Sequence, residues 1–241
     1  MNPYNLPSKD SDQGLLDGLK LLTPSKWLSV SDYKLDIVDV ASRPYQRMGE
    51  DFENTPIFDH FRSIAKQYPD KLAISDGTNK LTYFELFQGA ETLCKRITSA
   101  VPDGQPVGIV QANSVWYPLA MLASLAAGRL SILLNASDPP SRINEIVAAA
   151  RLSAVICHGH VPQAGLTQQV QWIDVPRVET KDARTLPPPL PGSVSVDAPA
   201  IVLYTSGSTG HPKGIVNSQR SLLRRVQQYV DACHINSEDV F

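Results

Sequence analysis

The chain has 241 residues, of which 42% are hydrophobic and 19% are charged, and its formal net charge at pH 7 is −2. These proportions are close to the averages for soluble globular proteins, so the chain can bury a core. So small a net charge gives no electrostatic reason to expect nucleic acid or an anionic membrane surface as a partner. The composition is compatible with small neutral or anionic ligands as partners.

Cysteine usage and hydropathy bound the cellular context. The three cysteines are far apart and include no C-x-x-C pair, so the sequence predicts neither a zinc site nor a disulfide framework. The N-terminus lacks the apolar run of a signal peptide, and the most apolar segment, residues 115–134, is interrupted by Pro118, Gly128 and Arg129. We therefore expect no export, no membrane span and a cytoplasmic location.

The chain begins without clear periodicity. Residues 1–55 mix short apolar groups with Pro, Ser and Asp, and we interpret them as an N-terminal extension or linker. From Pro56 the pattern becomes regular, since Ile57, Phe58, Phe61, Ile64 and Ala65 recur at helical spacing and Pro69 follows. This pattern predicts an amphipathic helix that closes before Pro69.

Strand-like and helical patterns then alternate. The expected strands are residues 72–75, 107–111, 130–134 and 154–158, and the expected helices are residues 83–97, 116–128 and 141–152. Two weaker strands, residues 170–175 and 200–206, are separated by a Pro-rich connector, residues 183–199. The alternation predicts βαβ units, and hence an α/β fold with a mainly parallel sheet flanked by helices.

A polar run follows the last expected strand. An ordinary turn uses one or two of Gly, Ser, Thr or Pro, whereas here six hydroxyl-bearing or glycine residues run without interruption and a lysine follows. Glycines let the backbone approach a ligand, and hydroxyls with successive N–H groups can donate to phosphate oxygens. The candidate site residues are Thr205, Ser206, Gly207, Ser208, Thr209, Gly210 and Lys213.

The next segment places this run within the expected fold. A helical pattern begins near Ser218 and continues through Leu222, Leu223, Val226 and Val230, so we expect the run to lie between a strand and a helix. Loops at the carboxyl ends of strands are where α/β folds bind ligands. The sequence therefore predicts a polyphosphate site at this edge of the sheet.

Two common nucleotide-binding loops do not fit the run. A P-loop needs a glycine before its lysine and a hydroxyl after it, but Pro212 precedes Lys213 and Gly214 follows it. A dinucleotide fingerprint fails because Gly207, Gly210 and Gly214 have the wrong spacing. A P-loop nucleotide hydrolase is therefore the least favoured interpretation.

The stretch YTSGSTGHPKGIV, residues 204–216, resembles the phosphate-binding signature of the adenylate-forming, or AMP-binding, enzyme superfamily. LTYFEL at residues 81–86 and the segment 122–156 are similar to further elements of that family. The resemblance covers about residues 55–241, and it implies that residues 56–241 are the N-terminal part of an adenylation domain. The superfamily includes acyl-CoA synthetases, luciferases and nonribosomal peptide synthetase adenylation domains.

Two of these segments also have a purely structural interpretation. LTYFEL predicts a helix start, with Thr82 as N-cap and Glu85 at the third helical position. DPP at residues 138–140 favours the peptide synthetase branch, but it equally predicts a helix that begins with proline. LSILLNAS, residues 130–137, departs from the usual pattern of that branch, so acyl-CoA synthetases stay open.

The resemblance implies a reaction. The carboxylate of an acid or amino acid would attack the α-phosphorus of ATP, giving an acyl- or aminoacyl-adenylate and pyrophosphate, with Mg²⁺ bridging phosphate oxygens. The acyl group would pass to a thiol of a carrier protein or coenzyme A. The hydroxyls and amides of residues 205–210 would hold the phosphates, and Lys213 would neutralise them or hold the loop closed. The sequence identifies neither the acid nor the acceptor.

In the family, the elements that bind adenine, ribose and magnesium, the hinge and the catalytic lysine all follow this loop. They cannot fit into the 28 residues after Lys213, so we expect no catalytic residue here, an incomplete enzyme and a complementary C-terminal polypeptide. We also expect an exposed sheet edge near Val240. The alternative is a noncatalytic phosphate-binding or partner-binding module derived from such an enzyme.

Other residues give weaker indications of a functional site than the polar run does. Cys157, His158 and His160 could bind a metal, but no fourth ligand is visible and we predict no metal site. His211 is interpreted as an exposed filler of the loop. The basic residues Arg220, Arg224 and Arg225 are interpreted as a solvated helix face.

Overall fold

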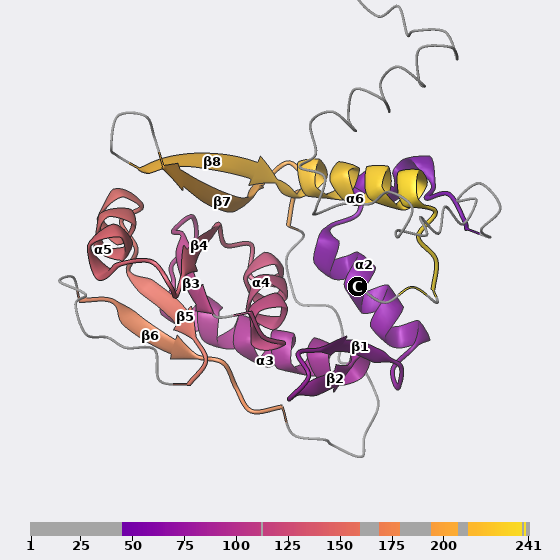
Figure 1. Cartoon of the computed structure of the whole chain (residues 1–241), viewed down its shortest axis with the longest axis horizontal. Helices are drawn as coiled ribbons and strands as arrows, with labels where there is room; N and C mark the ends of the chain where they lie inside the picture. The colour runs from indigo at the N-terminus through magenta and orange to yellow at the C-terminus, as the bar shows by residue number, and fades with distance from the viewer. Residues whose placement is uncertain are drawn as a thin grey trace, which may run out of the picture. The chain divides into compact units, whose positions relative to one another are not determined.

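The computed structural model describes residues 45–111, 113–159, 169–178, 194–206, 212–237 and 239. The chain divides into two compact units, Met1–Tyr45 and Gln46–Phe241, and the fold described below is that of the second unit (Figure 1). Its helices are η2 (Glu50–Asn54, a 3-10 helix), α2 (Ile57–Gln67), α3 (Tyr83–Ala100), α4 (Trp116–Ala126), α5 (Pro140–Ala149) and α6 (Gln219–Cys233). Its strands are β1 (Leu72–Ser75), β2 (Lys80–Thr82), β3 (Val107–Gln111), β4 (Ser131–Asn135), β5 (Ala154–Cys157), β6 (Gln171–Asp174), β7 (Pro199–Ser206) and β8 (Pro212–Ser218).

A six-stranded sheet of order β6-β5-β3-β4-β7-β8 organises this unit. The neighbours from β6 to β7 are parallel, and only the pair β7–β8 is antiparallel. The α/β prediction with a mainly parallel sheet is therefore confirmed. β1 and β2 form a separate antiparallel pair, which the sequence pattern did not predict.

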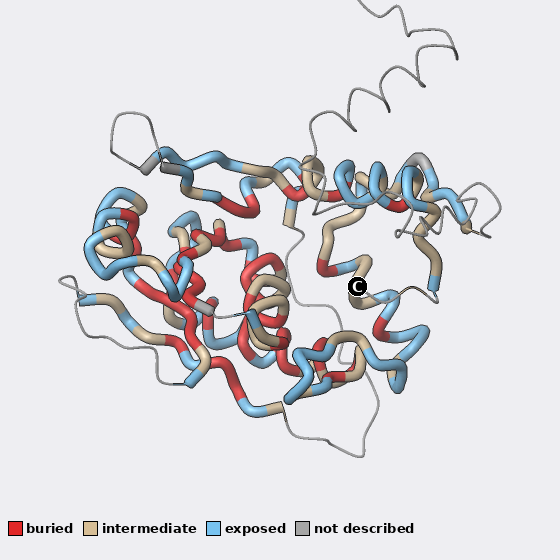
Figure 2. The backbone as a smooth tube through the Cα atoms, viewed as in Figure 1, coloured by how far each residue is buried: buried red, intermediate tan, exposed pale blue. Residues whose placement is uncertain are grey.

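The central strands are buried on both faces, which explains their unbroken apolar runs. Along β3, Ile109 packs into a core with α3 and α4, whereas its neighbour Val110 packs into a core with α5. Along β5, Ile156 and Val155 divide between the same two cores. Figure 2 shows the buried backbone concentrated in these strands and in α4, while β8 is largely exposed.

Two helix starts agree with the sequence. Thr82 caps α3 in a capping box, since the Glu85 amide donates to the Thr82 hydroxyl at 3.2 Å and the Thr82 amide donates to the Glu85 carboxylate at 2.8 Å. α5 begins with Pro140 directly after Pro139, because a proline in the first turn loses no helical hydrogen bond. Both segments are thus helix boundaries.

The segment after the polar run differs from the prediction. A helix was expected to begin near Ser218, and α6 does begin at Gln219 with Ser218 as its N-cap, but the strand β8 lies between the run and this helix. The β-branched residues Ile215 and Val216 favour a strand, and antiparallel pairing with β7 supplies hydrogen bonds for it. The strand before the run and the helix start near Ser218 are as predicted, but β8, which the sequence pattern did not predict, makes the run the turn of a hairpin.

Two helices bury a narrower face than predicted. In α6, Leu223 and Val230 are buried, but Val226 is 46% exposed. In α2, Phe58 and Ala65 are buried, but Ile64 is 39% exposed.

Among the described residues no helix is both long and apolar enough to cross a membrane.

Candidate functional site

The β7–β8 hairpin brings the two ends of the polar run together. Its register pairs Tyr204 with Gly214, Thr205 with Lys213 and Ser206 with Pro212. The structure thus describes three candidate site positions, Thr205, Ser206 and Lys213, on facing strands. The remaining candidates, Gly207, Ser208, Thr209 and Gly210, lie outside the described residues, as does His211.

Thr205 and Lys213 share one face of the hairpin. Directly opposite residues in an antiparallel pair project their side chains to the same side, and both of these residues are exposed. The Thr205 hydroxyl donates to the Lys213 carbonyl oxygen at 3.4 Å, a long hydrogen bond that a stronger acceptor could replace. The face therefore offers an accessible hydroxyl and an ammonium group to an anion.

Gly214 has a different role from the one its motif position suggests. Gly214 is not among the described glycines with positive φ, so its backbone conformation does not by itself require glycine. A Cβ atom at Gly214 would lie 2.9 Å from Val202 Cγ1 and 3.3 Å from Tyr204 Cζ. Glycine therefore leaves room for the Val202 and Tyr204 side chains, which lie against this position of β8.

The base of the hairpin is anchored in the core. Val202 is 5% exposed and Ile201 is 6% exposed, and both pair with β4. At the end of β8, the Gln219 side chain is 2% exposed, and its Oε1 accepts the amide of Ile57 at 2.9 Å. The first residue of α6 is thereby joined to the first residue of α2, directly after the end of β8.

An ionic cluster strengthens the same junction. Arg220 binds both carboxylate oxygens of Asp197, at 2.6 Å through Nε and 3.0 Å through Nη2, and its Nη1 donates to Asn54 Oδ1 at 2.8 Å. Arg224 makes a second two-point contact with Glu53. Interpreting Arg220 and Arg224 as a solvated face was therefore wrong, because their partners lie on η2 and on the segment before β7.

The charges in this cluster stabilise one another. The hydrogen bond from Arg224 lowers the pKa of Glu53, and the hydrogen bond from Arg220 lowers the pKa of Asp197. The same bonds raise the pKa values of the two guanidinium groups. All four groups thus stay charged near neutral pH.

The other candidate residues are used in packing. Burial raises the pKa of the Cys157 thiol, and the carboxylate of Asp174 adds to this. The His158 ring stacks on Trp116 with 4.3 Å between ring centroids, and His160 lies outside the described residues. Within the described ranges, no three His, Cys, Asp or Glu side chains gather as metal ligands would.

The mostly parallel sheet flanked by helices makes this an α/β protein. Residues 61–241 match the family described as AMP-binding enzyme, and the chain belongs to this family. Over 171 residues it is 33% identical to the Hybrid PKS-NRPs synthetase opdA of Penicillium oxalicum, an alignment covering 69% of this chain and 4% of that protein.

Solved structures agree on the fold. VinN superposes with a TM-score of 0.67 at 18% identity, covering 81% of this chain and 52% of that one. The N-terminal subdomain of NpsA from Klebsiella oxytoca superposes with a TM-score of 0.58 at 26% identity, covering 71% of this chain and 44% of that one. The chain thus spans about half the length of these two structures and a small part of the synthetase.

Proposed function

We propose that the chain supplies the polyphosphate-binding hairpin of an enzyme that activates a carboxylic or amino acid with ATP. The products would be an acyl- or aminoacyl-adenylate and pyrophosphate. One observation carries the proposal: in a chain of the AMP-binding family, Thr205 and Lys213 pair across the exposed hairpin. The residues proposed to hold the phosphates are Thr205, Ser206, Gly207, Ser208, Thr209, Gly210 and Lys213.

The chemistry of these residues fits the proposed step. When a carboxylate displaces pyrophosphate from ATP, negative charge increases on the leaving phosphates, and donors already aimed at them lower the barrier. Lys213 brings a positive charge, and Thr205 brings a hydroxyl on the same face. Loss of one such donor typically costs about 3 kcal/mol of barrier, or roughly a hundredfold in rate.

Mg²⁺ would accompany ATP in this proposal. Magnesium in nucleotide sites is usually bound by substrate phosphates with one or two carboxylates. In the described part of the chain no cluster of candidate ligands is found, so none of its residues is assigned to the metal. The proposed contribution of this chain is to the phosphate oxygens.

In the described sheet β8 pairs with β7 alone, and its other edge favours a polypeptide partner. Ile215 is 54% exposed, Val216 is 57% exposed, and Leu203 on β7 is 47% exposed. Ile215 and Leu203 pair on one face of the hairpin, and Val216 points to the other. Exposed apolar side chains beside an unpaired strand edge favour association. We propose that complementary polypeptide covers this edge and completes the nucleotide site.

The edge expected near Val240 lies outside the described residues, so β8 takes its place in the proposal. An amino acid is a reasonable first substrate class, because VinN forms a complex with L-aspartate. The thiol acceptor, a carrier protein or coenzyme A, stays part of the proposal.

Acid-dependent exchange of label between pyrophosphate and ATP tests the proposal. The sample is the 241-residue chain mixed with the polypeptide encoded downstream of it, and the substrates are panels of amino, aryl and fatty acids. Exchange that requires one acid supports adenylation. Pyrophosphate binding without exchange under every condition would favour the alternative, a noncatalytic phosphate-binding or partner-binding module.

A further inference from the structure

A polar groove runs beside α3, at the edge of the sheet opposite the hairpin. One hollow of about 550 Å³ lies between α3 and β6, and a second of about 320 Å³ lies between α3 and residues 176–178. Arg96 lines both hollows, so they are neighbours along α3, and we refer to the two together as the groove. The α3 wall is a single helical face, made of Gln88, Thr92, Lys95, Arg96 and Ser99.

The opposite wall contains a free strand edge. β6 pairs with β5 alone in the described sheet. The amides of Gln171 and Val175 donate to β5 or to the residue before it, at 2.8 and 2.9 Å. Because backbone groups of alternate residues point to opposite sides of a strand, Trp172 and Asp174 direct theirs away from β5, toward the groove.

Arg96 already uses one of these backbone groups. Its Nη1 donates to the Asp174 carbonyl oxygen at 3.0 Å. A charged side chain over a strand edge limits uncontrolled pairing with other chains. The bond is exposed, so a carboxylate could take Arg96 from the carbonyl in a stronger, charge-assisted contact. A partner that carries carboxylates would therefore draw Arg96 off the Asp174 carbonyl and leave that carbonyl free to pair with the partner's own backbone.

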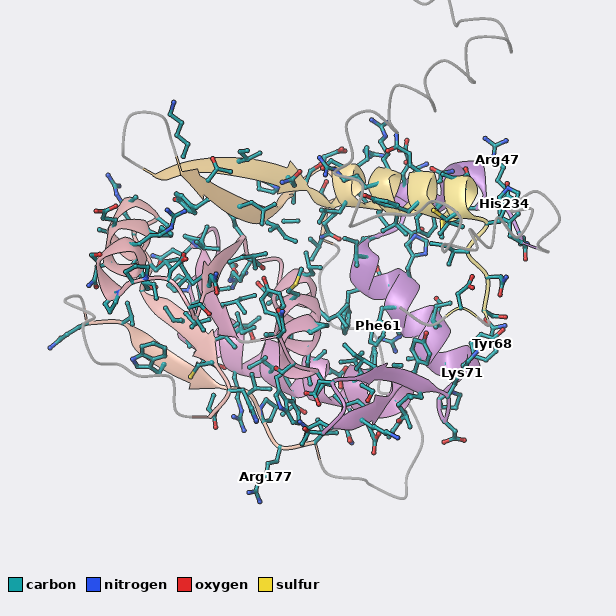
Figure 3. The ribbon with its side chains drawn as sticks, in the orientation of Figure 1. Arg47, Phe61, Tyr68, Lys71, Arg177 and His234 are labelled. Carbon is teal, nitrogen blue, oxygen red and sulfur yellow. The ribbon has the colours of Figure 1, made fainter. Side chains whose placement is uncertain are left out.

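The charge of the groove is mainly positive. Lys95, Arg96 and Arg177 are exposed, and Figure 3 shows Arg177 pointing away from the ribbon. Of the described residues that line the groove, Asp174 is the one acidic side chain. Glu91 forms an ion pair with Lys95 at 3.8 Å, so Lys95 is partly neutralised and Arg96 and Arg177 carry most of the remaining positive charge of the groove.

We propose that this groove binds an extended polypeptide segment rich in Asp or Glu. The segment would pair its backbone with the free edge of β6 at Trp172 and Asp174, and its carboxylates would contact Arg96, Lys95 and Arg177. The shape favours a peptide over a small anion, because a four-residue strand is about 13 Å long and the groove continues past its end. This site is separate from the proposed nucleotide hairpin.

A labelled peptide of four Glu-Val repeats, titrated into the 241-residue chain by fluorescence anisotropy, tests the proposal. We expect saturable binding that weakens with salt, and weaker binding by a Gln-Val analogue. Arg96→Gln and Arg177→Gln should each raise the dissociation constant about tenfold. Lys66→Gln, an exposed cation on α2, is the matched control and should change nothing. Lys213→Ala should also leave the affinity intact, which separates this site from the proposed nucleotide site.

Amide hydrogen exchange at Trp172 and Asp174 provides the second readout. Strand addition should slow both amides when the peptide is bound, whereas nonspecific charge attraction would not. Absence of binding, equal affinity in Arg96→Gln, or unchanged exchange at both amides would overturn the proposal. Competition by inorganic phosphate at low millimolar concentration, with no protection of the amides, would identify a small-anion site and would also overturn it.

Discussion

Thr205 and Lys213 lie directly opposite each other in the β7–β8 pair, and the Thr205 hydroxyl donates to the Lys213 carbonyl at 3.4 Å. This relationship places an ammonium group and a hydroxyl on one exposed face, although the two residues are eight positions apart in the sequence. The hairpin, rather than a strand-to-helix turn, is therefore the structural basis of the proposed phosphate site.

Lys213→Ala should weaken pyrophosphate binding without destabilising the fold. The side chain is exposed, so its removal leaves no cavity, whereas removing a charged donor to phosphate is expected to cost about tenfold in affinity. Titration with pyrophosphate, followed by NMR signals of the hairpin, measures the effect, and a thermal melt checks the fold. Lys66→Ala is the matched control. Equal affinity of Lys213→Ala and the unmodified chain would remove this lysine from the site.

Gly214→Ala should destabilise the hairpin. The added Cβ would lie 2.9 Å from Val202 Cγ1, which forces a shift of β7 or β8, and overpacking of this kind costs about 1–3 kcal/mol. Gly49→Ala is the control, because no atom lies within 4 Å of its added Cβ. Urea unfolding curves compare the two variants. If both unfold at the same urea concentration, the close approach of Tyr204 and Val202 to β8 is not a constraint.

Gln219→Met should loosen the junction between α6 and α2. The methionine keeps the volume of the buried side chain but cannot accept the Ile57 amide, now bonded at 2.9 Å, and a partly buried donor left unpaired costs about 1–3 kcal/mol. Chemical denaturation gives the stability, and amide exchange at Ile57 reports the local effect. Unaltered exchange at Ile57 would show that the bond does not hold the junction.

Asp76 should make the thermal stability of the protein depend on pH in the acid range. Backbone hydrogen bonds from Asn79 and Val115 lower its pKa from the usual 3.8 to about 2. A lowered pKa means that its stabilising effect is fully present above pH 3.8 and is lost as the pH falls toward 2. Thermal melts of Asp76→Asn and the unmodified chain between pH 5 and pH 2 measure this. The two melting temperatures should differ most at pH 5 and converge near pH 2, and a constant difference would contradict the assignment.

Local signals in the sequence were sufficient for most elements. Thr82 with Glu85, and Pro139 with Pro140, determine the starts of α3 and α5 through neighbours within one turn, so these starts could be predicted. β8 could not, because the glycine and proline content of residues 210–214 conceals a strand whose stability comes from pairing with β7. The register of the β7–β8 pair is also what places Lys213 on the same face as Thr205.

The anchoring residues needed tertiary information. Arg220 binds Asp197, 23 residues earlier, and contacts Glu53 from 167 residues away, and Gln219 bonds to Ile57 across 162 residues. A run of arginines on a helix has the same sequence pattern whether it is solvated or paired. Only the fold distinguishes these cases, and here it makes two of the three arginines part of the support for the hairpin.

The central claim, that this chain provides the phosphate-binding part of a carboxylate-activating enzyme, is tested most directly by ATP–pyrophosphate exchange on three samples. These are the 241-residue chain, the downstream polypeptide, and their mixture, each assayed with and without the acid panel. The account predicts exchange only in the mixture, dependent on one acid or acid class and reduced roughly a hundredfold by Lys213→Ala. Exchange by the chain alone, or none in a mixture that forms a stable complex, would contradict it.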